Sequence, residues 1–226
     1  IDVHFSNTST TQFGGYPIWD LFCRRIGLNQ RLARHIRMQR GPAAFTAPEL
    51  AQFLIDAKAL GVERLTHVDT LRLDPLLCQC AGIDGLPSGK TLGLFLKEHE
   101  DHHLIGLDHL NTRLNNELWK KLRRNSSKTK QKAMERVILD YDSTTFTVYG
   151  KQEEADRGRS FRKKDKPGYQ PRFAFIGGLG IAVHQELLPQ SNNLNKDFLS
   201  FHQEAIERLP KTANVWAVRG DGALYF

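Results

Sequence analysis

The spacing of the apolar positions changes once along the chain, and this change divides the sequence. Up to residue 124, apolar side chains recur every three or four residues, which predicts helices. One of them is opened by Pro48 and stopped by Gly61. After residue 136 the apolar spacing becomes two, which predicts strands. We therefore expect three parts: a helical region over 1–124, a basic linker over 125–136 and a strand-rich region over 137–226.

The strand-rich region predicts a sheet with one helix inserted in it. Strands are expected at residues 137–142, 145–149, 172–176, 181–188 and 215–218, with an amphipathic helix at 198–209. The first two are expected to be joined by a short turn. We interpret the order as strand-strand-strand-helix-strand, the front half of a ribonuclease-H-like fold with a mixed sheet. The fold class is then α+β or α/β, a helical N-terminal region followed by a truncated ribonuclease-H-like domain.

Acidic residues interrupt the first apolar strand and follow the last one. Asp140 and Asp142 are separated by one residue, so their side chains point to the same face of a strand. Carboxylates on an otherwise apolar strand are costly unless a metal ion or an arginine pairs with them. The last strand runs into Arg219-Gly220-Asp221. The first and the last strand, which are the first and fourth of the strand-strand-strand-helix-strand order, lie side by side in the expected fold, so we expect Asp142 and Asp221 to converge.

Such a carboxylate pair favours hard cations, Mg²⁺ or Mn²⁺, over zinc. Two metal ions held in this way activate a water or a 3′-hydroxyl and stabilise the leaving oxygen of a phosphodiester. For Asp142 taken alone, an acid that caps a turn at a strand end is an equally good interpretation.

Two short motifs imitate ligand sites. Residues 85–91 end in Gly-Lys-Thr, but three residues separate the glycines where a phosphate loop requires four, and no strand precedes them. Ser88 is instead expected to cap a helix that includes Thr91. His99 and His103 satisfy the zinc-protease pattern H-E-x-x-H, with Glu117 as the near candidate for a third ligand. A solvated helix junction also explains these histidines and is the interpretation that we favour.

The net charge of +7 and the pI near 9.4 favour a polyanionic partner, although a basic protein without one is equally compatible with them. No apolar run approaches the roughly 18 residues of a membrane span, so we expect no membrane association. Three cysteines without C-x-x-C spacing favour a reducing, cytoplasmic compartment. The start at Ile1 and the stop at Phe226 indicate that both ends are cut.

Several motifs, taken in their order and spacing, resemble those of one family. They are LDYDST at 139–144, YGKQ at 149–152, GYQP at 168–171 and VRGDG at 218–222, with LRLDP at 71–75 and LPSGKTL at 86–92 upstream. The chain resembles a DDE-type bacterial insertion-sequence transposase, most like the thirteen-eighty group. By this resemblance Asp142 is the first catalytic acid, Asp221 is the second, and Asp140 is a support or the alternative ligand. The family's third acid, a glutamate, has no counterpart before Phe226.

The resemblance also implies the substrate and the partners. The family cuts double-stranded DNA at the terminal inverted repeats of its element and joins these ends to target DNA, using Mg²⁺ or Mn²⁺ in a two-metal site. A nucleoid-associated cytoplasmic protein is expected, with a homodimer as one assembly open to it. Base readout is expected from the N-terminal helices. The residues expected to contact DNA phosphates are Lys120, Lys121, Arg123, Arg124, Lys128, Lys130, Lys132, Arg157, Arg159, Arg162, Lys163 and Lys164.

Because the third acid has no counterpart, we expect this chain to lack a complete two-metal site and to be inactive in cleavage. The alternatives are a truncated, non-catalytic DNA-binding remnant and, with less support, a zinc-dependent hydrolase built on His99 and His103.

Overall fold

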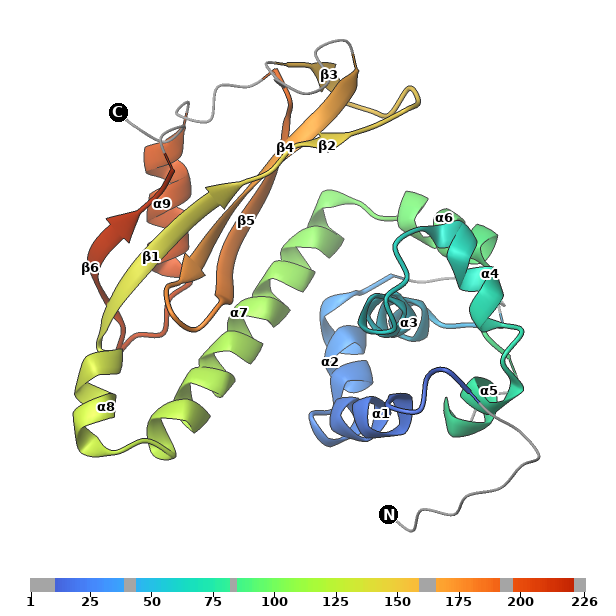
Figure 1. Ribbon diagram of the computed structural model, residues 1–226, viewed down its shortest axis with the longest axis horizontal. Helices are drawn as coiled ribbons and strands as arrows, with labels where there is room; N and C mark the ends of the chain where they lie inside the picture. Colours follow the sequence, from blue (N-terminus) through green and yellow to red (C-terminus); the bar gives the residue numbers. More distant parts are fainter. Residues whose placement is uncertain (1–10, 39–43, 82–84, 159–165, 192–196, 222–226) are drawn as a thin grey trace. The chain divides into compact units, whose positions relative to one another are not determined.

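The computed structural model describes residues 11–38, 44–81, 85–158, 166–191 and 197–221 (Figure 1). The chain divides into two compact units, residues 1–110 and 111–226. This division falls inside α7 (Asp101–Arg124), earlier than the boundary expected after residue 124. None of the described helices is long and apolar enough to cross a membrane.

The first unit is built from short helices and the beginning of α7. They are α1 (Tyr16–Arg25), α2 (Leu28–His35), α3 (Ala47–Ala59), the 3₁₀ turn η1 (Leu65–His67), α4 (Val68–Leu71), α5 (Pro75–Ala81) and α6 (Gly89–Lys97). The helix predicted between Pro48 and Gly61 is confirmed as α3. It begins with a capping box in which the Thr46 backbone N–H donates to Glu49 Oε2 at 2.7 Å. It ends before Gly61, whose φ of +82° suits a glycine.

The second unit contains a mixed sheet. Its elements after α7 are α8 (Lys128–Met134), β1 (Arg136–Ser143), β2 (Phe146–Thr147), β3 (Asp156–Arg157), β4 (Pro167–Ile176), β5 (Ile181–Pro189), α9 (Phe198–Glu207) and β6 (Asn214–Arg219). Strand β4 pairs antiparallel with both β1 and β5, and β6 pairs parallel with β1 (Figure 1). With β1, β4 and β5 as the three antiparallel strands, the predicted ribonuclease-H-like order and the mixed α+β class are confirmed.

One face of this sheet forms the core of the second unit. Val137, Leu139 and Tyr141 alternate with more exposed residues along β1 and are almost completely buried. They pack in one apolar cluster with Trp119 of α7 and Phe201 of α9. The alternation therefore leaves both acids of β1 on the other face, and the sequence prediction that they share a face is confirmed.

Two segments differ from their expected structure. The strand expected at residues 145–149 is reduced to β2, which pairs with β4 rather than with β1. It does not pair with β1 because β4 and β6 occupy both edges of β1. The expected linker at 125–136 contains α8, whose first turn is capped by the Ser127 side chain accepting from the backbone N–H of Lys130.

Candidate functional site

The parallel pairing of β1 with β6 contains an irregularity that determines the site. Val137 pairs with Val215, but the next residue of β1, Ile138, pairs with Ala217. Strand β6 thus has one extra residue, Trp216, which is a β-bulge. Beyond this bulge the pairing continues regularly to the end of β6.

The bulged register aligns the two acids proposed as catalytic. Asp140 of β1 pairs with Arg219 of β6. Asp142 and Asp221 each lie two residues beyond this pair, Asp142 inside β1 and Asp221 in the segment that follows β6, and both are exposed. Extending the register by two residues sets Asp221 opposite Asp142, on strands that are about 4.8 Å apart.

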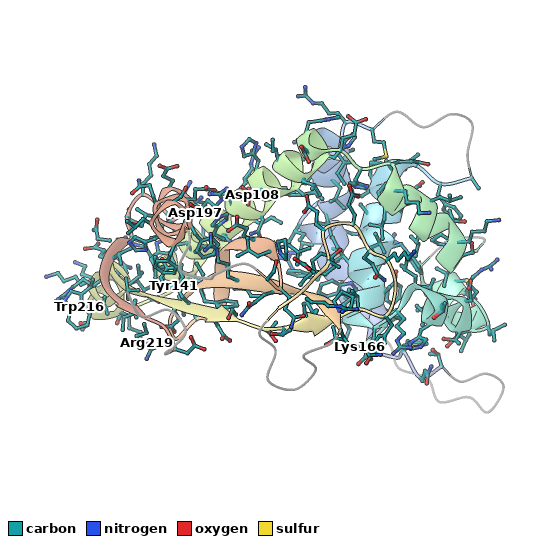
Figure 2. The ribbon with its side chains drawn as sticks, turned by 90° about the horizontal axis from the view of Figure 1, so that it is seen from above. Asp108, Tyr141, Lys166, Asp197, Trp216 and Arg219 are labelled. Carbon is teal, nitrogen blue, oxygen red and sulfur yellow. The ribbon has the colours of Figure 1, made fainter. Side chains whose placement is uncertain are left out.

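Asp140 is engaged by an arginine. The Arg219 Nε donates to Asp140 Oδ1 and the Nη2 donates to Oδ2, each at 2.6 Å, which is a two-point contact of guanidinium with carboxylate. The hydrogen bond and the charge of Asp140 raise the pKa of Arg219. Arg219 and Trp216, both of β6, are labelled in Figure 2. Sequence reasoning anticipated an arginine partner for an acid on this strand but did not identify which arginine.

The site offers two carboxylates to a hard cation. Among the described residues there is no group of three or more His, Cys, Asp or Glu side chains that could hold a metal ion. Asp142 and Asp221 offer carboxylate oxygens only, and Mg²⁺ is commonly bound through one or two carboxylates together with substrate phosphates. This pair therefore fits Mg²⁺ or Mn²⁺ and does not resemble a zinc site.

The histidine motif does not have the geometry of a zinc protease. That motif requires both histidines on one helix, whereas α7 begins at Asp101, after His99. His99 Nδ1 donates to the Phe95 carbonyl at 2.9 Å, and His103 Nδ1 accepts from the Glu100 backbone N–H at 3.0 Å. Burial and the neighbouring histidines lower the pKa of His103. These contacts belong to a helix junction, so the zinc-hydrolase alternative is not supported.

The segment that imitates a phosphate loop is a helix start, as predicted. The Ser88 side chain accepts from the Thr91 backbone N–H at 3.1 Å and caps α6. Gly89 is required by packing, since a Cβ there would come within 2.4 Å of the Leu65 backbone oxygen.

The basic residues expected to contact DNA lie on several elements. Lys120, Lys121, Arg123 and Arg124 are in the last turns of α7, Lys128, Lys130 and Lys132 are in α8, and Arg157 is in β3. The remaining ones, Arg159, Arg162, Lys163 and Lys164, lie outside the described residues.

A groove in the second unit joins two of these residues to a third cation. Lys120 and Arg123 of α7 line it on one side, and Lys211, from the segment between α9 and β6, lines it on the other. Trp119 also lines the groove, and its Nε1 donates to Thr212 Oγ1 at 3.1 Å. Sequence reasoning missed Lys211 because nothing in the local pattern relates it to a helix about ninety residues earlier.

Comparison with protein-family models gives a match over almost the whole chain. The family model described as "Transposase DDE domain group 1" matches residues 1–225. No curated protein matches the chain.

Similar solved structures are complexes of the Mos1 transposase. The "Mos1 transposase paired-end complex with left transposon end" is 13% identical with a TM-score of 0.21, and the alignment covers 76% of this chain and 50% of that one. The "pre-cleavage Mos1 transpososome" is 10% identical with a TM-score of 0.24, over 95% and 73% of the two chains. The chain thus spans half the length of the first of these structures.

Proposed function

The chain belongs to group 1 of the DDE transposase domain family, and from this premise we propose that it acts in metal-dependent cleavage and strand transfer of DNA. The proposed substrate is the terminal inverted repeat of an insertion sequence of the thirteen-eighty group, in a bacterial host. We further propose a cytoplasmic, nucleoid-associated protein whose partners are double-stranded transposon ends and target DNA, and which works as a homodimer.

The observation that carries this proposal is the alignment of two exposed acids at the ends of neighbouring parallel strands. Asp142 and Asp221 lie equally far beyond the Asp140–Arg219 pair, on the sheet edge where β1 and β6 end. Their carboxylates would hold Mg²⁺ or Mn²⁺. When bound, such an ion stabilises the charge that develops on the reacting phosphate oxygens and lowers the pKa of a water nucleophile. The contribution of the chain itself is to hold two carboxylates side by side on a rigid sheet.

The basic groove gives the proposal a surface for the DNA backbone. Lys120, Arg123 and Lys211 place three cationic groups around it, with Glu207 as an opposing charge. Cations of this kind neutralise phosphates and fix the position of a duplex without reading its sequence. We assign base readout to the helices of the first unit.

A non-catalytic DNA-binding remnant is the second candidate function. The observation that favours it is the absence of a three-residue metal-ligating group among the described residues. Both candidates require DNA binding, and they differ in cleavage. Because the chain supplies two of the three acids that the resemblance implies, we expect it, purified alone, to bind duplex DNA in a salt-sensitive way and not to nick it in Mg²⁺. Sustained Mg²⁺-dependent nicking would contradict the second candidate.

The groove predicts opposite effects for substitutions of opposite charge. Lys211→Gln should weaken duplex binding and reduce the slope of log K against log salt concentration by about 1, because one phosphate contact is lost. Glu207→Gln should strengthen binding, since it removes a negative charge from the same groove. Fluorescence anisotropy over a range of salt concentrations measures both. Equal affinities and slopes for the two variants would exclude this groove as the DNA surface.

A further inference from the structure

The bulge in β6 decides which residue stands opposite the first acid. Before the bulge, Val137 pairs with Val215. Had that register continued, Asp142 would face Gly220. The extra residue shifts the pairing by one, so that Asp221 comes opposite Asp142. Because side chains alternate along a strand, the unbulged register would also turn the Asp221 side chain to the other face of the sheet.

The Asp140 and Arg219 side chains distinguish these two registers chemically. In the bulged register they make two hydrogen bonds of 2.6 Å. In the unbulged register Val218 would pair with Asp140, and the Arg219 guanidinium would lie on the opposite face of the sheet. Gly177 confines Asp140 from another side, since a Cβ at Gly177 would come within 2.8 Å of Asp140 Oδ2. The backbone N–H of Gly177 donates to the Ile138 carbonyl at 2.8 Å.

The bulged residue has its own contact with β1. The guanidinium of Arg136 lies over the Trp216 ring, 4.8 Å from its centroid. This contact holds Trp216 at the start of the pairing, and the Asp140–Arg219 pair holds its far end. Of these two contacts, only the Asp140–Arg219 pair lies beyond the bulge, on the side of the acids.

We propose that the Asp140–Arg219 ion pair is a register lock, which selects the bulged pairing of β6 with β1 and so positions Asp221 beside Asp142. Both members are positioning residues: they act on the acids through the strand pairing. This proposal rests on the proposed function only in the catalytic role that it gives to Asp142 and Asp221. The choice of register is a property of the sheet.

Disulfide trapping measures the register of β6 against β1 in the purified chain, without metal or DNA. One variant carries Asp142→Cys with Asp221→Cys, and a second carries Asp142→Cys with Gly220→Cys. Residues paired across neighbouring strands have the Cα separation that a disulfide requires, and the alternation of faces makes trapping selective. Peptide mass mapping separates the new bond from the native cysteines. We expect the 142–221 bond to form at least about ten times faster than the 142–220 bond.

Removing the ion pair should change this preference. In Asp140→Asn and in Arg219→Gln, the ratio of the two trapping rates should fall about fivefold, the effect expected of one well-aligned, partly exposed ion pair. The matched control is Glu135→Gln, which breaks the 2.8 Å contact of Glu135 with Arg123 at the other end of β1. It should leave the ratio unchanged.

An unchanged ratio in both charge-removing variants would contradict the lock, as would a dominant 142–220 bond in the parent chain. If circular dichroism shows that either variant has lost its sheet, Arg219→Lys decides, because it keeps the charge without the two-point contact. A parental ratio in that variant would overturn the proposal, and an intermediate ratio would support it. Absence of cleavage by the natural protein would contradict the proposed function and leave these ratios untouched, so the two failures are distinguishable.

Discussion

Replacing either proposed catalytic acid should abolish Mg²⁺-dependent cleavage of transposon ends. In a protein active in cleavage, we expect Asp142→Asn and Asp221→Asn each to lower the cleavage rate by at least about 1,000-fold. A bound metal ion contributes several kcal/mol to the transition state, and each 1.36 kcal/mol is tenfold in rate. Both side chains are exposed, and neither belongs to the apolar cluster of the sheet, so their replacement should leave the sheet intact. Single-turnover cleavage of a labelled duplex measures the effect.

The control for this experiment is binding of the same duplex. Neither acid belongs to the basic groove, so both variants should retain parental affinity in the absence of metal. Cleavage at the parental rate by Asp142→Asn would move the catalytic role to Asp140 or remove the assignment altogether. Loss of DNA binding together with cleavage would show that the substitution disturbs the sheet and not the chemistry.

The largest effect on stability is expected at the centre of the sheet. Leu139 is fully buried between strands and helices, with 0% exposure, on the face of β1 opposite the acids. Leu139→Ala should destabilise the second unit by roughly 2–5 kcal/mol, because it removes apolar burial and leaves a cavity. With a urea dependence of about 1–3 kcal/mol per molar, the unfolding midpoint should fall by about 1 M or more.

The two compact units can unfold separately, so the measurement has to report on the sheet itself. Hydrogen exchange of peptides from β4 and β5 along a urea gradient does this. Leu199→Ala is the matched control, since Leu199 of α9 is 77% exposed and its loss should change stability by less than about 0.5 kcal/mol. Equal midpoints for the two variants would contradict the packing described for β1.

The parts of the fold set by local physics could be predicted from the sequence. The cap formed by Ser88 and the helix between Pro48 and Gly61 depend on residues a few positions apart, and both are present. The alternation along β1 correctly put Asp140 and Asp142 on the same face of the strand. The adjacency of β1 and β6 followed from the strand order, because an αβ crossover of this kind brings parallel strands together.

The parts that depend on pairing between distant residues could not be predicted. The bulge at Trp216 has no local signal, since it reflects a competition between two registers of β6 against β1. The partner of Asp140 follows from that register, and so does the alignment of Asp221. The pairing of β2 with β4 could not be predicted either, because it depends on β4 and β6 occupying both edges of β1.

The central claim is that Asp142 and Asp221 form one metal-binding pair, and paramagnetic broadening by Mn²⁺ tests it most directly. In amide NMR spectra of this chain, millimolar Mn²⁺ should selectively broaden the signals of residues 141–143 and 219–221. Each of Asp142→Asn and Asp221→Asn should remove the broadening at both segments, because the proposed site holds the ion between the two carboxylates. Broadening that persists at one segment after the acid of the other is replaced, or that is centred on His99 and His103, would contradict the account.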